Sequence, residues 1–473
     1  MIEKNEILTI AKNLGLNPDT VEKDYALGWM LHGIGEHQST KDWAFKGGTS
    51  LKKCFFETFR FSEDLDFTLI DNSHLDTGFL QGVFSEITEF ISDTVGIEFF
   101  PDQFKFKVID KGNGNYSAQG KIHYNGPLRR KGGFATIKLD LTTDEILVLD
   151  TVRREVHHPY SDNPSEGIHA NCYAFEEVVA EKVRALAQRI RPRDLYDVVH
   201  FFRNREMITN PQLVYNTLGQ KCAFKKMDIP TFEHIKQHEK LDELEPQWEH
   251  MLAHQLPALP PMDSFWSDLE PFFDWLNDQL NVERLVEAKI ADEVIQIGRF
   301  GTYTEDVSSI SKIQFSAANR VCIKLGYNGK LRTVEPLSFR RNTKNGNKLF
   351  YGFEREAGHV KAYSISNIQS VEITNLPYTE KYPVEISSTG AVSMPPIRRS
   401  ATTGISSRVS RGIRPVTRTR PSANKFSSSG LTHKIRCPMC QKTFSRKGMF
   451  DTKLNKHKNE YGMECPGRIG YVV

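Results

Sequence analysis

The sequence predicts an α+β protein of several domains, and three observations support this. Helical periodicity and strand alternation occupy separate stretches of the 473-residue chain, which is long enough for about two to four domains. A β-prone region begins near position 291, and a segment with few large apolar residues begins near position 384. We therefore predict a first domain over 1–290 with a helical extension, a small β-rich domain over 291–383, a flexible basic linker over 384–432 and a cysteine-containing module over 433–473.

Composition excludes several classes of protein. No stretch reaches the ~20 apolar residues of a membrane span, and the polar, acid-containing N-terminus is unlike a secretory signal. The cysteines number seven, an odd count, and four of them are scattered, which is typical of a reducing compartment and not of a disulfide scaffold. We expect a cytoplasmic protein that does not contact membranes.

The formal net charge of +3 hides an uneven distribution. Residues 386–450 contain thirteen Lys and Arg and no Asp or Glu, which leaves a net charge of −10 on the rest of the chain. Because clustered positive charge attracts phosphate backbones, the C-terminal region is predicted to contact DNA or RNA. Because the rest of the chain is negatively charged overall, any RNA-binding groove in the first domain must depend on a local group of basic residues.

The elements of the first domain follow from periodicity. Residues 1–40 predict helices, and amphipathic helices are predicted again at 80–91, 175–190 and 195–202. Residues 98–150 alternate as strands do and carry glycines at their turns. The first domain therefore mixes helices with a sheet.

The most informative segment, residues 43–70, predicts a strand, a turn, a helix over 51–59 and a second strand. Gly47 and Gly48 open a small-residue turn whose backbone N–H groups are available to a phosphate. Asp64 and Asp66 stand two apart in the second strand, so both carboxylates point to one face. A divalent cation would relieve their repulsion. The pattern suits transfer of a nucleotidyl group with Mg²⁺; a surface turn followed by a solvated strand is the alternative.

Two further groups strengthen this hypothesis. Asp140 lies on the polar face of a predicted strand at 135–141, where a third carboxylate would allow two Mg²⁺ ions to bind, one at the attacking oxygen and one at the leaving pyrophosphate. Lys182 abuts the apolar stripe of the helix at 175–190, from which it can reach phosphates as a point charge. The alternative is a pair of amphipathic helices with charged outer faces.

Five segments occur in a fixed order between about positions 5 and 205, namely 21–25, 45–51, 60–67, 176–186 and 193–197. As a set they resemble the AbiEii/AbiGii toxin family of nucleotidyltransferases. The resemblance implies a DNA polymerase beta-like nucleotidyltransferase fold and the toxin half of an abortive-infection (phage defence) or type IV toxin–antitoxin pair. It implies use of an NTP and Mg²⁺ to modify RNA, in some members the acceptor end of tRNA, and a cognate antitoxin protein.

The resemblance also assigns roles to individual residues. Asp64 and Asp66 would hold Mg²⁺, with Asp140 as a looser third carboxylate, and Lys182 would act with Asp197 or Asp194. The expected nucleotide-binding residues are Lys46, Gly47, Gly48, Thr49, Ser50 and Ser62. Fourteen residues separate Thr49 from Asp64, which is longer than the spacing usual in the superfamily and leaves the alignment of Thr49 and Ser50 open.

Residues 321–376 resemble the WYL domain, a small β-rich sensor of nucleic acids or nucleotides. The tripeptide that names that domain appears only as Phe350-Tyr351-Gly352. Candidate ligand contacts are Arg340, Arg341 and Arg355. A generic β-domain with solvated charges is the alternative.

The C-terminus carries four metal-binding residue types at the spacing of a zinc site. Cys437 and Cys440 form a Cys-x2-Cys pair. Sixteen residues lie between Cys440 and His457, and seven lie between His457 and Cys465. These four predict a tetrahedral, structural Zn²⁺ site. The segment resembles a C2H2-type finger with Cys in place of the last His, and its Arg446 and Lys447 are candidate contacts for nucleic acid. Contact with a protein is the alternative.

Together these observations predict a Mg²⁺-dependent nucleotidyltransferase toxin that transfers NMP from an NTP to RNA. Two other hypotheses belong to different classes. One is a nucleic-acid-binding regulator with an inactive enzyme domain, and the other is an NTP-dependent modifier of proteins.

Overall fold

The computed structural model describes residues 1–56, 59–112, 114–130, 133–277, 290–297 and 305–387, and, near the C-terminus, 433–437, 440, 442–446, 454, 457–458, 464–465 and 471–472. The chain divides into two compact units, Met1–Arg399 and Ser400–Val473. Most of the predicted linker at 384–432 lies outside the described residues, as does Lys447. None of the helices in the described part is long and apolar enough to cross a bilayer.

Helices α1 (Lys4–Leu14) and α2 (Pro18–Glu36) open the chain, as their periodicity predicts. Asn17 caps α2 by accepting a hydrogen bond from the N–H of Asp19. Pro18 occupies the first turn, where a missing N–H costs nothing. Helix α2 is buried on most sides because it contacts both β8 (Ile168–Cys172) and α4 (Thr77–Val95).

A mixed sheet organises the first unit. Its eight strands, counted over the residues described, run in the order β3-β5-β6-β2-β1-β8-β7, with β4 beside β5. The pairs β2–β6 and β1–β8 are parallel and the others are antiparallel. The remaining bounds are β1 (Ala44–Lys46), β2 (Asp64–Thr68), β3 (Glu98–Phe99), β4 (Lys105–Gly112), β5 (Asn115–Asn125), β6 (Ala135–Thr142) and β7 (Val152–Val156).

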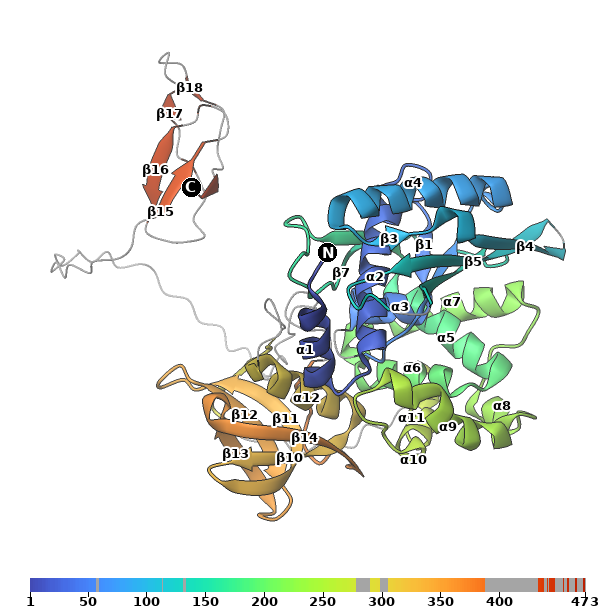
Figure 1. The fold of residues 1–473 in the computed structure, drawn as a ribbon. Coiled ribbons are helices and arrows are strands. Elements are labelled where there is room, and N and C mark those ends of the chain that lie inside the picture. The colour runs from blue at the N-terminus through green and yellow to red at the C-terminus, as the bar shows by residue number, and fades with distance from the viewer. Residues whose placement is uncertain are drawn as a thin grey trace, which may run out of the picture. The chain divides into compact units, whose positions relative to one another are not determined.

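The two faces of this sheet differ in polarity. Apolar side chains such as Leu65 on β2 and Leu139 on β6 are buried on one face. Helix α4 covers that face (Figure 1). There Phe84 packs on Phe106 with ring centroids 5.5 Å apart. The alternating residues of β2 and β6 are the acids and lysines predicted for the opposite face. The predicted alternation at 135–141 is confirmed.

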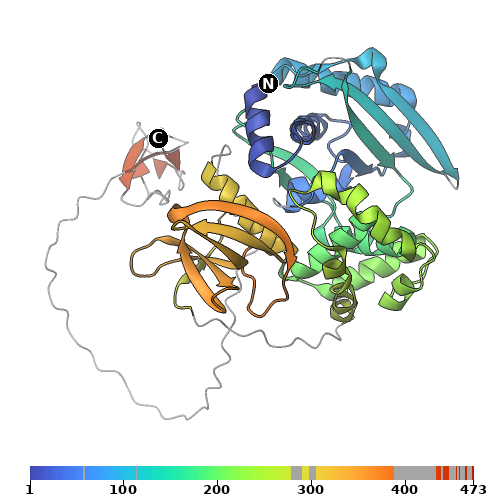
Figure 2. The ribbon, with the colours of Figure 1, turned by 60° about the horizontal axis from the view of Figure 1, so that its bottom comes forward.

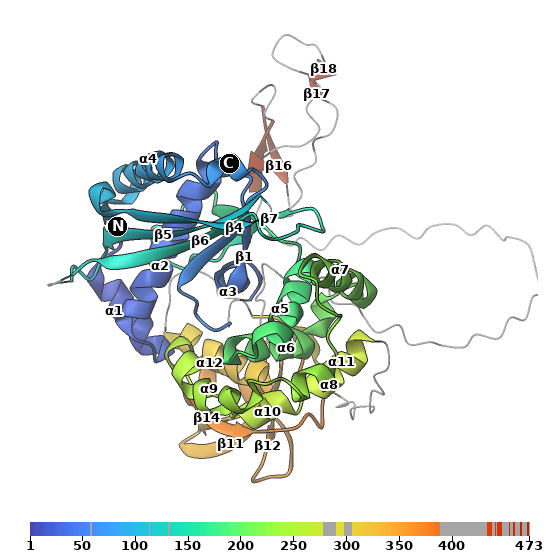
Figure 3. The same cartoon turned by 90° about the vertical axis from the view of Figure 1, so that its right-hand side faces the viewer.

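A helical cluster lies on the polar side of the sheet. Helix α5 (Phe175–Arg189) contacts both α6 (Pro192–Arg203) and α7 (Pro211–Phe224). Shorter helices extend the cluster: α8 (Phe232–Lys236), α9 (Leu244–Leu252), α10 (Met262–Trp266) and α11 (Leu269–Leu276). These green helices gather together in Figure 2, and in Figure 3 the sheet lies between them and α4.

The segment after β1 departs from its prediction. Helix α3 (Gly47–Ser50) starts at the first glycine and continues directly as a π-helical turn, η1 (Leu51–Phe55). The glycines therefore form the first turn of a helix and not a loop before it, and the helix ends before Phe56 instead of reaching Phe59. π-helical turns of this kind recur at functional sites.

A second sheet forms the β-rich domain, with the order β13-β12-β11-β10-β14 and β9 beside β11. Helix α12 (Glu305–Asn319) contacts β10, β11 and β14 (Figure 2). The domain has its own core but belongs to the first compact unit, where Arg203 Nη1 of α6 donates to the carbonyl oxygen of Asn319 at 3.0 Å. Bounds are β9 (Glu293–Ile295), β10 (Val321–Tyr327), β11 (Lys330–Arg341), β12 (Lys348–Glu354), β13 (His359–Ser364) and β14 (Ile368–Pro377).

The second unit contains short strands in its described residues. They pair as β16-β15-β19 and as β17-β18. Their bounds are β15 (His433–Arg436), β16 (Thr443–Arg446), β17 (His457–Lys458), β18 (Glu464–Cys465) and β19 (Tyr471–Val472).

Candidate active site

Three carboxylates meet on the polar face of the first sheet. Because β2 and β6 run parallel in register, Asp66 lies directly beside Asp140, and Asp64 lies beside Lys138. Strand alternation then puts Asp64, Asp66 and Asp140 on one face, as the sequence predicts. Parallel pairing of two strands more than seventy residues apart in the chain thus creates an acidic cluster.

The negative charges of the three carboxylates repel one another. Burial, together with the neighbouring Asp140 and Asp64, raises the pKa of Asp66 to about 6, although Lys46 acts to lower it. Burial also raises the pKa of Asp140. The Oδ1 atom of Asp64 is buried without a hydrogen-bond partner in the described structure, and its ion pair with Lys138 at 3.8 Å is too long to be a hydrogen bond. A divalent cation would relieve the repulsion among these carboxylates.

Helix α3 approaches these carboxylates closely because it begins with two glycines. Gly47 has φ +78°, and a Cβ added there would lie 2.0 Å from Asp66 Oδ2. A Cβ on Gly48 would lie 2.9 Å from both Arg60 Nη2 and Ser62 Oγ. Only glycine therefore allows the backbone of this turn to reach the acidic cluster.

Alanine at Gly47 should disrupt the site. Gly47→Ala places a methyl group against Asp66 and strains a left-handed backbone, which costs about 1–3 kcal/mol before any displacement of the carboxylate. We expect a lower melting temperature and weaker Mg²⁺ binding, measured by calorimetry. Gly82→Ala is the matched control, because a Cβ at this helical glycine meets nothing within 4 Å. Equal behaviour of the two variants would contradict the close approach.

Thr49 and Ser50 occupy positions that the sequence pattern did not foresee. The Thr49 hydroxyl donates to the carbonyl oxygen of Asp64 at 2.5 Å, and the Ser50 hydroxyl donates to that of Gly47 at 2.9 Å. Both residues are buried and neither lines the cavity beside the carboxylates. The Thr49 hydroxyl joins α3 to β2 and the Ser50 hydroxyl stabilises the first turn of α3, so a direct contact with triphosphate is not what this geometry provides.

Lys182 of α5 reaches the site through a buried network. Its Nζ lies 2.7 Å from Asp197 Oδ2 and 3.6 Å from Asp194 Oδ1, both on α6. Asp197 is fully buried and also accepts two hydrogen bonds from Arg60, at 2.7 and 2.8 Å. Burial alone would raise the pKa of Asp197, but Arg60 and Lys182 outweigh it and lower that pKa. Asp197 thus orients Lys182 from within the protein and does not face the cavity.

Arg60 and Glu181 are partners that were absent from the predicted site set. Besides Asp197, Arg60 donates to Gln255 Oε1 at 2.9 Å and lines the cavity. Glu181 pairs with Lys46 Nζ at 3.3 Å. Burial opposes the Glu181 charge, but Lys46 and other nearby cations lower the pKa of Glu181 to about 2. Both residues lie inside the motifs at 60–67 and 176–186, and no sequence signal distinguishes them from surface charges there.

A cavity of about 490 Å³ joins these groups. One wall carries the three carboxylates, and the other carries cations from the helical cluster, including Lys182, Arg189 and Arg193. Of the predicted residues, those lining this cavity are Lys46, Gly47, Gly48, Ser62, Asp64, Asp66, Asp140, Lys182 and Asp194. The cavity therefore places a negative cluster opposite a positive wall, as a metal-bound polyphosphate requires.

The arginines predicted to contact a ligand in the β-rich domain are occupied within it. Arg340 is buried and pairs with Glu385 Oε2 at 2.6 Å. Arg355 pairs with Glu335 Oε1 at 2.9 Å. Arg341 is exposed at the end of β11. Two of the three candidates thus stabilise the domain, and the WYL-like interpretation of this segment stays a prediction.

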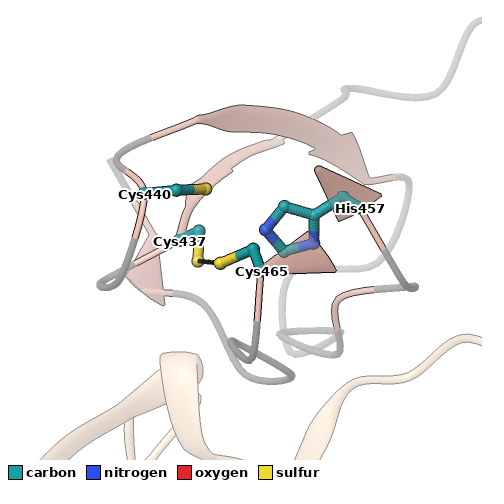
Figure 4. Close-up of side chains that lie close together, drawn as sticks. All are labelled: Cys437, Cys440, His457 and Cys465. Atoms are coloured by element: carbon teal, nitrogen blue, oxygen red, sulfur yellow. Dashed lines mark hydrogen bonds between the residues drawn. The ribbon is translucent and has the colours of Figure 1, made fainter. Parts of the chain in front are cut away.

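The C-terminal unit brings its four predicted ligands together. One ligand atom from each of Cys437, Cys440, His457 and Cys465 lies within 4.8 Å of the others (Figure 4). Leu454 and Phe444 pack against the cluster as a small apolar core. His457 lies in strand β17, paired with β18, which differs from the helical histidine of a C2H2-type finger. Of Arg446, only the backbone in β16 is described.

The first unit thus brings acidic strands, a glycine-initiated helix and a group of cations together around one cavity. The family model described as "Nucleotidyl transferase AbiEii toxin, Type IV TA system" matches residues 29–278, more than half of the chain. The protein belongs to this family of nucleotidyltransferase toxins.

The chain is weakly similar to individual solved structures. The nucleotidyltransferase toxin MenT4 from Mycobacterium tuberculosis is 20% identical, with a TM-score of 0.41, and the match covers 57% of this chain and 89% of that one. The structure of JHP933 from Helicobacter pylori is 17% identical, with a TM-score of 0.36, and covers 56% and 94% of the two chains. No curated protein sequence matches the chain.

Proposed function

We propose that the protein transfers a nucleoside monophosphate from an NTP to RNA and that it requires Mg²⁺. The observation that carries this proposal is the cavity beside the sheet. It is lined by three carboxylates from strands β2 and β6 and by cations of the helical cluster, including Lys182. Asp64, Asp66 and Asp140 would hold the metal. Asp64 Oδ1 lacks a hydrogen-bond partner among the described residues, and the negative charges of Asp64 and Asp140 lie close to that of Asp66, where a cation would relieve their repulsion. When bound, Mg²⁺ neutralises phosphate charge and activates the attacking oxygen.

The residues of the chain position the reactants. Lys182, fixed by Asp197, neutralises the triphosphate as a point charge, and the first turn of α3 presents its backbone to the phosphates. An RNA hydroxyl oxygen forms a bond to the α-phosphorus while the bond from that phosphorus to pyrophosphate breaks. The hydroxyl proton passes to the Asp140 carboxylate, which lies beside Asp66 and lines the same cavity.

Metal binding should weaken in acid. The pKa of Asp66 is about 6 because of burial and its acidic neighbours, so the carboxylate is protonated below that pH and ionised above it. Since a proton competes with the metal, we expect Mg²⁺ affinity to fall about tenfold per pH unit below pH 6. Calorimetric titration with Mg²⁺ between pH 5 and pH 8 measures this. A pH-independent affinity would remove Asp66 from the metal site.

Labelled NTPs distinguish the proposed enzyme from its rivals. The full chain is incubated with each α-³²P NTP, Mg²⁺ and either total bacterial RNA or total protein, and the products are separated on gels. We expect label in an RNA band. Label in a protein band would instead identify a protein modifier. Absence of both transfer and NTP binding would favour the nucleic-acid-binding regulator.

The family implies a partner. Because the chain belongs to toxins of type IV toxin–antitoxin systems, we propose that a cognate antitoxin protein restrains it and that the pair acts in phage defence. Co-expression with the neighbouring gene product should relieve growth arrest by the toxin. Growth arrest that no co-expressed neighbour relieves would argue against such a pair.

We propose structural Zn²⁺ at the C-terminal cluster, because three thiols and one imidazole within 4.8 Å match tetrahedral coordination. Cys440→Ser should abolish stoichiometric zinc in the purified protein, measured by elemental analysis. Cys322→Ser, at a buried thiol of β10 outside the cluster, is the control and should retain zinc. Zinc retained by both variants would contradict the assignment.

The zinc-bearing unit and the basic stretch at 386–450 are further proposed to bind DNA or RNA.

A further inference from the structure

A row of lysines crosses the first sheet and ends at the acidic cluster. Lys105 of β4 is in register with Lys121 of β5, which is in register with Lys138 of β6, which lies beside Asp64 of β2. The neighbouring row on the same face runs from Lys107 through Gln119 and Asp140 to Asp66. Adjacent strands are about 4.8 Å apart, so the first row spans roughly 10 Å from Lys105 to Lys138.

Folding does not account for these charges. Lys105, Lys107 and Lys121 are exposed and form no ion pair with any residue in the described part of the chain. Lysines that face each other directly across strands repel and destabilise the sheet. A group of like charges that the fold does not neutralise indicates a binding surface for an anion.

Two cavities meet at the carboxylates. The first, lined by Lys182 and the cations of the helical cluster, is the proposed nucleotide cavity. The second, of about 380 Å³, lies over β4, β5 and β6 and is lined by all four lysines. Both cavities share Asp64, Asp66, Asp140 and Gln119. The carboxylates therefore stand between two positively charged spaces, as a transfer reaction with two anionic substrates requires.

We propose that Lys105, Lys107, Lys121 and Lys138 bind the phosphate backbone of the acceptor RNA strand and lead its reacting hydroxyl to the carboxylates, while the NTP occupies the first cavity. This inference rests on the proposed function and specifies the acceptor side of the same site. A nucleic-acid strand suits the row better than an acidic protein segment, because its charges repeat at short, regular intervals along one line.

The salt dependence of RNA binding tests the lysine row. The full-length variant Lys105→Gln/Lys107→Gln/Lys121→Gln is compared with Lys4→Gln/Lys12→Gln/Lys41→Gln, which removes the same charge from exposed sites on other elements. The probe is a fluorescein-labelled 20-nucleotide oligo(U). Each lost phosphate contact lowers the slope of log K against log salt by about 0.7, so we expect the row variant to lose about 2 units and the control almost none. The basic C-terminal region contributes equally to all three proteins and cancels in the comparison.

Two further measurements make the result specific. Affinity for a fluorescent ATP analogue should be unchanged in the row variant, and RNA should protect Lys105 and Lys121 from acetylation, read by mass spectrometry, but not Lys12. Three results would each overturn the proposed binding of the acceptor RNA to the lysine row. They are a salt slope equal to that of the unmodified protein, a loss of nucleotide affinity as large as the loss of RNA affinity, and an equal loss of affinity for poly-L-glutamate. If the unmodified protein transfers no NMP at all, the proposed function fails, whereas the slope and the footprint still decide whether the row binds RNA.

Discussion

Asp64→Ala should reduce NMP transfer by about 10³-fold or more while leaving the fold intact. Asp64 contributes the buried Oδ1 atom, which has no hydrogen-bond partner in the described residues and only a long ion pair, 3.8 Å, with the exposed Lys138, so we expect the fold to tolerate its loss. Its loss removes a proposed metal ligand and a negative charge beside the cations of the cavity. Initial rates with labelled NTP and RNA, at saturating Mg²⁺, measure the effect.

The control for this variant is Asp93→Ala, which removes an exposed acid from α4 on the other side of the sheet. It should retain full transfer activity, and both variants should keep the melting temperature of the unmodified protein within a few degrees. Transfer at the normal rate by Asp64→Ala would exclude the acidic cluster as the catalytic centre. A large loss of stability in that variant would instead show that Asp64 supports the fold.

Arg60→Met should destabilise the protein strongly. Arg60 is 2% exposed, makes two hydrogen bonds to the fully buried Asp197 and a third to Gln255. Methionine fills a similar volume but leaves Asp197 with Lys182 as its one remaining cation among the described contacts. Removing one partner from a buried ion pair costs about 3–5 kcal/mol, which corresponds in a unit of this size to a fall in melting temperature of roughly 5 °C.

Two variants calibrate the Arg60 result. Arg60→Lys keeps the positive charge but cannot make the bidentate hydrogen bond to Asp197, so we expect an intermediate fall in melting temperature. Arg153→Met removes an exposed arginine of β7 and should change the melting temperature by little. If Arg60→Met unfolds at the same temperature as Arg153→Met, the buried network does not stabilise the first unit.

Local pattern predicted much of the fold. The amphipathic helices at 80–91 and 175–190 correspond to α4 and α5, and the β-prone runs after position 291 correspond to β9, β10, β12, β13 and β14. Two elements of that region were not predicted. Strand β11 carries charged residues and a proline, and α12 (Glu305–Asn319) contains four serines, which are not strong helix formers.

Sequence alone determined that Asp64 and Asp66 share a face, that Lys182 borders an apolar stripe, and that four C-terminal residues have zinc spacing, because each depends on periodicity or spacing within one short segment. Only the tertiary structure decided that Asp140 lies beside Asp66, that Thr49 and Ser50 turn inward, and that Arg60 binds Asp197 across 137 positions of the chain. Such contacts depend on which strands pair and where a helix begins. Those choices are made by the burial of the whole core, which no short stretch of sequence encodes.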